Sequence, residues 1–255
     1  MRATTVNNDT LQNFAGDGFI ALRNFVGGEE LSDVRGRAEQ FIENVVPQMP
    51  PEQVFYEDKH DRTTLKQIQH LSDHDAWFRE LFTAGQFREV AELLLDGPVV
   101  PVNMQYFNKP PGSGQPTPPH QDGYYFMLDP CLAVTMWLAL DDVDEENGCV
   151  RYVRGSHTRG MRGHARTQTL GFSQGITDYP TDFDRKCELA LSAQPGDLLV
   201  HHAMTIHRAD GNQSASRPRR ALGFIYYSAE AREDAKAHAN YQRKLAEEMK
   251  AAGKI

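Results

Sequence analysis

Three residues of the sequence have the types and spacing to hold one divalent metal ion. His120 and Asp122 stand two positions apart before the run 124–126, which is expected to be extended, and His207 precedes the polar turn ADGN. In extended chain, residues i and i+2 point to the same side, so these two side chains offer a nitrogen and an oxygen to one ion while Gln121 points away. Two histidines and a carboxylate leave half of an octahedron open, as in non-haem Fe(II) oxygenases, whereas structural zinc wants a fourth protein ligand.

His201 and His202 are alternatives to His207 as the third ligand. In one continuous strand from residue 198, His201 faces the same side as His207 and His202 faces the opposite side, so alternation removes only His202. A break in that strand would void the test. An HxD pair alone is weak evidence, because a surface histidine near an aspartate is commoner than a pair of ligands.

The elements that must position these residues change in character along the chain. Up to residue 97 the pattern predicts mainly helices: one within 27–46, whose apolar residues recur at helical spacing, and two between 75 and 95, with a short edge strand at 19–22. After residue 98, short apolar runs alternate with turn residues and predict strands at 99–107, 133–140, 149–153, 197–202 and 222–227. This pattern predicts an antiparallel sandwich or barrel with the helices outside it.

The length of the chain indicates one domain made of three parts. We expect a helical part over about 1–97, a β core over about 98–228 and a charged surface helix over about 229–251, with Tyr241, Leu245 and Met249 on one face. Composition is that of a globular protein, with 40% hydrophobic and 24% charged residues, so the chain should fold.

Charge and hydropathy exclude several classes of partner. The formal net charge of -8 argues against a nucleic-acid-binding protein, which needs a basic surface. The sequence contains neither a long apolar run nor the apolar core of a signal peptide, so we expect a cytoplasmic protein without a membrane partner. Cys131, Cys149 and Cys187 form no CxxC pair and are expected to be reduced thiols. Nothing in the sequence indicates the oligomeric state.

Several blocks of the sequence resemble the phytanoyl-CoA dioxygenase family. They are NKPPGSG (108–114), PHQD (119–122), TMWLALDDVDEENGCVRYVRGSH (135–157), PGDLLVHHAMTIHRADGN (195–212) and RPRRAL (217–222), in the family's order. The resemblance implies a double-stranded β-helix, the cupin-like jelly-roll barrel, flanked by helices. It also implies an Fe(II)- and 2-oxoglutarate-dependent dioxygenase that uses O2 to hydroxylate a substrate and releases succinate and CO2.

The resemblance also assigns roles to individual residues. The metal ligands of the family match His120, Asp122 and His207, and its basic residue that binds the distal carboxylate of 2-oxoglutarate matches Arg219. Because residues 211–216 are one longer than the usual interval, Arg217 and Arg220 remain alternatives. The residues that match other positions of the cosubstrate pocket are Gln105, Trp137 and Lys66, although Lys66 without the resemblance is expected to be solvated.

The substrate is a small organic molecule of unknown identity. The segment 151–166 carries Arg151, Arg154, Arg159, Arg162 and Arg166, and it is interpreted equally well as a solvated loop or as a surface that recruits an anionic substrate. Arg154, which replaces the family's proline, and Tyr124 are candidate substrate contacts. Acyl-CoA thioesters and phosphonates are possible substrates for this family. A non-catalytic metal-binding jelly roll is the alternative function, and halogenation is disfavoured because Asp122 fills the position of a halide.

Overall fold

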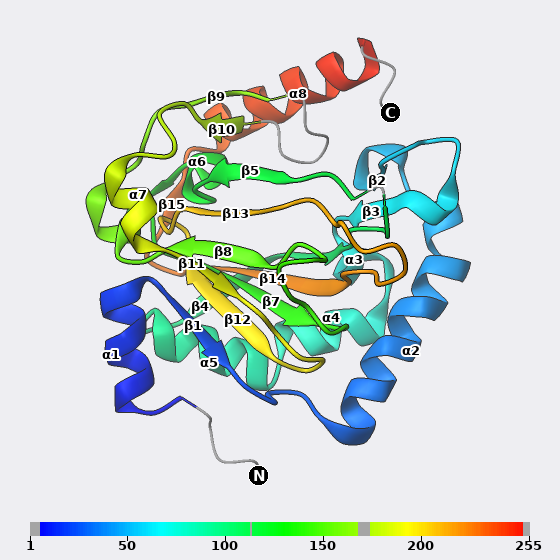
Figure 1. Cartoon of the computed structure of the whole chain (residues 1–255), viewed down its shortest axis with the longest axis horizontal. Helices are drawn as coiled ribbons and strands as arrows, with labels where there is room; N and C mark the ends of the chain where they lie inside the picture. Colours follow the sequence, from blue (N-terminus) through cyan, green and yellow to red (C-terminus); the bar gives the residue numbers. More distant parts are fainter. Residues whose placement is uncertain (1–5, 113, 168–173, 252–255) are drawn as a thin grey trace.

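Two antiparallel sheets face each other in the computed structural model, which describes residues 6–112, 114–167 and 174–251 (Figure 1). The larger sheet has the spatial order β1 (Phe19–Leu22), β12 (Leu198–His202), β7 (Ala133–Ala139), β14 (Ala221–Ser228), β4 (Val99–Phe107), β3 (Leu65–Ile68) and β2 (Val54–Tyr56). The smaller sheet has the order β11 (Glu188–Leu191), β8 (Val150–Val153), β13 (His207–Ala209) and β5 (Thr117–His120). Two-stranded pairs join β9 (His164–Arg166) to β10 (Gln174–Ile176), and β6 (Leu128–Asp129) to β15 (Arg232–Glu233).

Helices cover the outer face of the larger sheet, and the first and last elements of the chain are also helices (Figure 1). The α-helices are α1 (Asn8–Asp17), α2 (Gly28–Asn44), α3 (Leu71–His74), α4 (Ala76–Thr83), α5 (Gln86–Leu94), α6 (Gly123–Phe126), α7 (Asp182–Cys187) and α8 (Ala235–Ala251), and short 3-10 turns lie at Val46–Gln48, Pro51–Gln53, Arg62–Thr64 and Ser156–Arg159. Asp75 begins α4 by accepting hydrogen bonds from the amides of Trp77 and Phe78. The ring of Phe87 in α5 stacks on Phe224 of β14, with 4.2 Å between centroids.

The central strand β7 shows how the sheet separates the core into two layers. All seven of its residues are buried, as expected for a strand with both faces covered. Val134, Met136 and Leu138 belong to the apolar cluster under the helices, whereas Trp137 and Ala139 belong to the cluster between the two sheets. The period of two therefore directs Trp137 towards the smaller sheet.

The structure confirms the predicted antiparallel sandwich and adds strands that the pattern missed. The strand predictions at 19–22, 99–107 and 222–227 agree with β1, β4 and β14 within a residue, and the helices around Gly85 are α4 and α5. The N-terminal part is not only helical, because β2 and β3 were missed and extend the larger sheet next to β4. The predicted jelly roll is confirmed: in the described ranges the seven-stranded and four-stranded sheets form its two layers, and strand pairing does not close them into a barrel.

The structure also bears on the predictions for the cysteines, for membrane-spanning helices and for the C-terminal helix. Cys131, Cys149 and Cys187 are free thiols, as predicted. No helix in the described part of the chain is both long and apolar enough to cross a membrane. Tyr241 of α8 is half-buried, while the side chains of Leu245 and Met249 lie outside the described residues.

Candidate metal centre

Two strands of the smaller sheet, β5 and β13, and the turn that follows β5 bring three potential metal ligands together. His120 is the last residue of β5, His207 is the first residue of β13, and the two are paired directly across the strands. Their rings are 4.1 Å apart between centroids. Asp122 has α-helical backbone angles (φ -58°, ψ -35°) at the start of α6. The predicted strand at 124–126 is wrong, so Asp122 reaches the histidines through a turn and not through strand alternation.

The ligand atoms converge without any rearrangement of side chains. One ligand atom from each of His120, Asp122 and His207 lies within 4.8 Å of the other two. Asp122 Oδ1 is 3.3 Å from His120 Nε2 and 3.7 Å from His207 Nε2. Nδ1 of His120 lies 2.8 Å from the carbonyl of Pro118, and Nδ1 of His207 lies 3.0 Å from the carbonyl of Thr205. Since a carbonyl only accepts, each Nδ1 carries the proton and each Nε2 presents its lone pair to the centre.

The electrostatics of the site give His207 and Asp122 the protonation states that metal ligands require. Burial, together with His120 and His201 nearby, lowers the pKa of His207 well below its usual range, so its imidazole is neutral. Burial alone would raise the pKa of Asp122, but the neighbouring histidines His207, His120 and His201 outweigh it and hold this pKa well below its usual range. The site therefore combines the neutral imidazole of His207 with the ionised carboxylate of Asp122.

The two rival histidines have other roles in the structure. The strand that was expected to be continuous breaks after His202, so the alternation argument does not apply. His201 Nε2 lies 3.1 Å from Asp122 Oδ2, but His201 is not part of the converging group. His202 Nδ1 accepts a hydrogen bond from the amide of Met204, and its ring lies near Phe14. Burial lowers the pKa of His202 to about 4, so this partly buried imidazole is neutral.

Arg219 is a buried cation between the two sheets. Only 5% of the residue is exposed, and its Nε donates to the carbonyl of Gly148 at 3.0 Å. Its Cζ lies 5.2 Å from the centroid of the Trp137 ring. Burial lowers the pKa of Arg219 to about 10, so the guanidinium is still charged at neutral pH. Within residues 6–112, 114–167 and 174–251, no carboxylate pairs with it.

The alternative arginines are both engaged by carboxylates on the surface. Arg217 forms ion pairs with Asp144 and Glu146, and Arg220 forms ion pairs with Asp141 and Glu39. Of the three arginines in the motif RPRR, Arg219 alone is both buried and left without an anionic partner in the described structure. An anion brought into the space between the sheets would therefore be attracted to Arg219.

Gln105 and Trp137 lie on one row of the larger sheet. Gly223 of β14 pairs with Gln105 of β4 on one side and with Trp137 of β7 on the other. Residues paired across strands point to the same face, so both side chains face the smaller sheet. A Cβ at Gly223 would lie 2.6 Å from Cε2 of Phe107, so glycine leaves room for that ring. This row of Gln105, Gly223 and Trp137 thus forms the floor of the space between the two sheets, beside Arg219.

Lys66 does not join this floor. It is 7% exposed, contrary to the expectation of a solvated side chain, and its Nζ lies 3.2 Å from Glu57 Oε2. Its neighbour Gln67 instead donates to Gln105 Oε1 at 2.9 Å. Sequence reasoning missed Gln67, although alternation in the strand LKQI separates it from Lys66.

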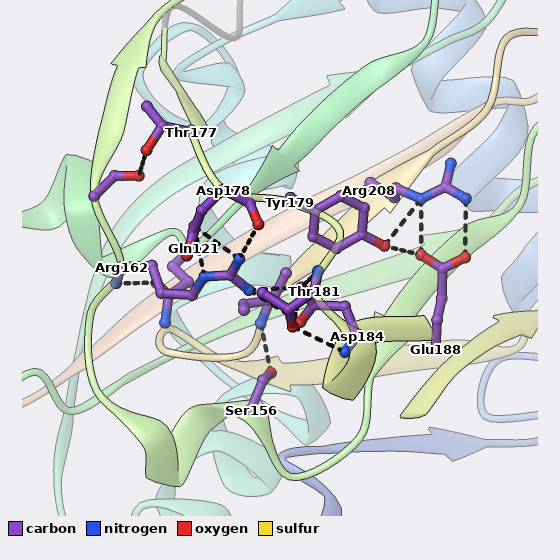
Figure 2. Close-up of polar contacts among 12 residues, drawn as sticks. Gln121, Ser156, Arg162, Thr177, Asp178, Tyr179, Thr181, Asp184, Glu188 and Arg208 are labelled. Carbon is purple, nitrogen blue, oxygen red and sulfur yellow. Dashed lines mark hydrogen bonds and ion pairs between the residues drawn. The ribbon is translucent and has the colours of Figure 1, made fainter. Parts of the chain in front are cut away.

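The basic segment 151–166 is largely neutralised by the protein's own acidic residues. Its ion pairs are those of Arg151 with Glu145, Glu188 and Asp210, of Arg154 with Asp17, and of Arg162 with Asp178 and Asp184. Figure 2 shows Arg162 between Asp178 and Asp184, with the Arg208, Glu188 and Tyr179 cluster beside it. Arg159 and Arg166 lie over the rings of Phe183 and Tyr241. The structure gives no support to recruitment of an anion by this segment.

The two candidate substrate contacts differ in their positions. Arg154 has a half-exposed side chain that pairs with Asp17 of α1, and no contact in the described structure joins it to the three ligands. Tyr124 follows Asp122 by two residues and stacks on His164, with 4.3 Å between centroids. Tyr125 stands edge-on to His120 at 5.8 Å. Aromatic rings therefore border the site on the side of α6.

A model of the phytanoyl-CoA dioxygenase (PhyH) family matches residues 14–221. The chain is 27% identical over 245 residues to phytanoyl-CoA dioxygenase 1 of Oryza sativa subsp. japonica, covering 83% of this chain and 86% of that protein. It is 26% identical over 231 residues to the peroxisomal phytanoyl-CoA dioxygenase of Rattus norvegicus, of which it spans only 66%.

Solved structures with a similar arrangement are non-haem iron oxygenases. The α-ketoglutarate-dependent carbocyclase SnoK from nogalamycin biosynthesis superposes with a TM-score of 0.72 at 23% identity, covering 94% of this chain and 92% of that one. EctD from S. alaskensis, solved with 2-oxoglutarate and 5-hydroxyectoine, gives 0.72 at 16% identity, covering 89% and 78%. At these identities both show a shared fold. EvdO2 from Micromonospora carbonacea, solved with 2-oxoglutarate, gives 0.71 at 25% identity, covering 92% and 96%.

Proposed function

The chain belongs to the phytanoyl-CoA dioxygenase family of 2-oxoglutarate-dependent non-haem iron oxygenases, and we propose that it hydroxylates a small organic molecule with release of succinate and CO2. His120, Asp122 and His207 hold Fe(II). The observation that carries the proposal is the convergence of two Nε2 atoms and one carboxylate oxygen, with both Nδ1 protons held by backbone carbonyls. When bound, the iron would supply activation of O2 coupled to decarboxylation of 2-oxoglutarate.

The cosubstrate requires a fixed cation for its distal carboxylate. Arg219 meets this need because it is charged, buried and without a carboxylate partner in the described structure. Its guanidinium can bind a carboxylate through two parallel hydrogen bonds, and the Trp137 ring beneath it restricts its orientation. Gln105 offers an amide on the same floor. These contacts favour Arg219 over Arg217 and Arg220, whose charges are already compensated.

The substrate approaches from the side of α6 in this proposal. Tyr124, Tyr125 and His164 give this side aromatic surfaces next to His120. The expectation of an anionic substrate depended on the arginines of residues 151–166, and their ion pairs remove that support. The proposal therefore does not specify the charge of the substrate, and acyl-CoA thioesters and phosphonates belong in the panel to be screened.

The experiment follows metal, cosubstrate and turnover separately. Fe(II) and then 2-oxoglutarate are added under argon, and the metal-to-ligand absorption band is recorded, before O2 is admitted and succinate is measured with a panel of substrates. We expect the band and succinate release in the wild type, and neither in His207→Ala. His202→Ala is the matched control and should retain both. Stable Zn(II) binding without the band and without any succinate would favour a non-catalytic metal-binding protein.

A further inference from the structure

The two oxygens of the Asp122 carboxylate have different surroundings. Oδ1 faces Nε2 of His120 and of His207, as described above. Oδ2 is 2.6 Å from Thr135 Oγ1 and 3.1 Å from His201 Nε2. One oxygen is therefore directed to the metal position, while the other is occupied by two side chains that can donate hydrogen bonds.

The donors come from adjacent strands of the larger sheet. Thr135 of β7 and His201 of β12 are paired in register and point to the same face, towards the smaller sheet. His201 is 3% exposed and Thr135 is 8% exposed, so neither hydrogen bond competes with bulk water. The carboxylate is thus held by the opposite sheet from the one that carries the histidine ligands.

Tyr152 lies against the other ring nitrogen of His201. Its hydroxyl lies 3.1 Å from His201 Nδ1, and its ring is fully buried and stacked on Phe19 at 4.6 Å. Because a carboxylate oxygen only accepts, the N–H of His201 lies on Nε2, which faces Asp122 Oδ2, and Nδ1 is left to accept a hydrogen bond from the Tyr152 hydroxyl.

We propose that His201, oriented by Tyr152, is a positioning residue that fixes the orientation of Asp122, so that this carboxylate offers one oxygen to the metal and not two. The inference rests on the proposed metal site. A carboxylate that bound through both oxygens would occupy a fourth position, and the open positions for cosubstrate and O2 would fall from three to two. Residues that hydrogen-bond to metal ligands typically change metal affinity or activity by about 10–100-fold when they are replaced.

The test uses Co(II) as a spectroscopic probe in the full-length protein without any turnover. His201→Phe keeps a planar ring but removes the donor, and its Co(II) affinity should fall by about 10–100-fold with a change in the visible spectrum, which reports coordination number. His201→Gln places an amide N–H near the position of Nε2 and should restore the affinity and spectrum of the wild type. His202→Phe, at the neighbouring position on the opposite face, is the matched control and should leave the spectrum unchanged.

Tyr152→Phe tests the second step and guards against a failure to fold, because it retains the buried ring. We expect a smaller loss of affinity than in His201→Phe and no additional loss when the two changes are combined, since both act on one hydrogen bond. The inference would be overturned if His201→Phe kept the Co(II) affinity and spectrum of the wild type, or if His201→Gln lost as much affinity as His201→Phe. It would also be overturned if the losses of His201→Phe and Tyr152→Phe added up in the double variant. A wild type that bound no Co(II) would instead refute the metal site itself.

Discussion

Replacing Arg219 with methionine should weaken binding of 2-oxoglutarate while leaving the ligand-free protein as stable as before. Methionine keeps an apolar stem against Trp137 but removes the guanidinium. If the guanidinium pairs with the distal carboxylate, its removal leaves a buried anion unpaired, which costs on the order of 2–5 kcal/mol. Since about 1.4 kcal/mol corresponds to tenfold, the dissociation constant should rise by at least about 25-fold.

The stability of the ligand-free protein follows from the burial of the charge. The lowering of the pKa of Arg219 to about 10 corresponds to on the order of 3 kcal/mol against the charged form in the folded state. Methionine removes this cost and also the hydrogen bond to Gly148, which is worth about 1.5–3 kcal/mol. The two effects nearly cancel, so the free energy of unfolding should change by less than about 1 kcal/mol.

The assay combines an anaerobic titration of 2-oxoglutarate into the Fe(II)-loaded variants with denaturant unfolding of the metal-free proteins. Arg220→Met is the matched control: it leaves Asp141 without its partner, so it should lose stability but keep normal affinity for the cosubstrate. Normal affinity in Arg219→Met with a loss of several kcal/mol would show that Arg219 is a structural residue. If only Arg220→Met bound 2-oxoglutarate weakly, the contact with the distal carboxylate would be assigned to Arg220 and not to Arg219.

Three further outcomes are expected. Arg162→Met leaves the fully buried Asp184 carboxylate unpaired and should lower the free energy of unfolding by about 3 kcal/mol in a denaturant titration; a change below about 1 kcal/mol would contradict this. Burial raises the pKa of the Asp197 carboxyl, but backbone amides and Arg23 lower it by more, so the pKa in the folded state lies below that in the unfolded state. The ionised carboxylate therefore stabilises the fold above the unfolded-state pKa, and this stabilisation is lost as the pH falls through the folded-state pKa. Asp197→Asn should therefore be less stable than wild type by about 1–3 kcal/mol near pH 7 and should approach it in acid, whereas a gap constant with pH would refute the assignment. Gly223→Ala crowds Phe107 and should cost about 1–3 kcal/mol; wild-type stability would mean that the ring moves freely.

The sequence was informative where local pattern and tertiary environment agree. Strand β4 was predicted to the residue and β14 within one residue at each end, because apolar residues fill each run and turn residues bound it. β2 and β3 were missed because three or four residues carry too little pattern, and their extended shape comes from pairing with β4. β13 was missed for the same reason: residues 203–206 continue the run of β12 in the sequence, but in the structure β12 ends at His202 and β13 begins in the other sheet at His207.

The site shows the same division between local and tertiary information. His120, Asp122 and His207 were candidates from residue type and order, and the structure brings their ligand atoms together. The route was mispredicted, because Tyr124 to Phe126 have strand propensity but form α6, where the amide of Gly123 donates to Ala203. The position of His201 beside Asp122 depends on register between β7 and β12, which sequence alone does not give.

The distribution of charge suggests how an acidic protein binds a dianionic cosubstrate. The net charge is -8, and Arg151, Arg154 and Arg162 are engaged by carboxylates, so long-range attraction contributes little. In the proposed function the distal carboxylate is bound by short-range contact with Arg219, which is 5% exposed. Mobile ions screen exposed charges over about 10 Å at 0.1 M but act weakly on buried pairs. The affinity for 2-oxoglutarate should therefore change by less than about threefold between about 0.05 and 0.5 M salt. A steep fall with salt would show that surface cations, and not Arg219, dominate the binding.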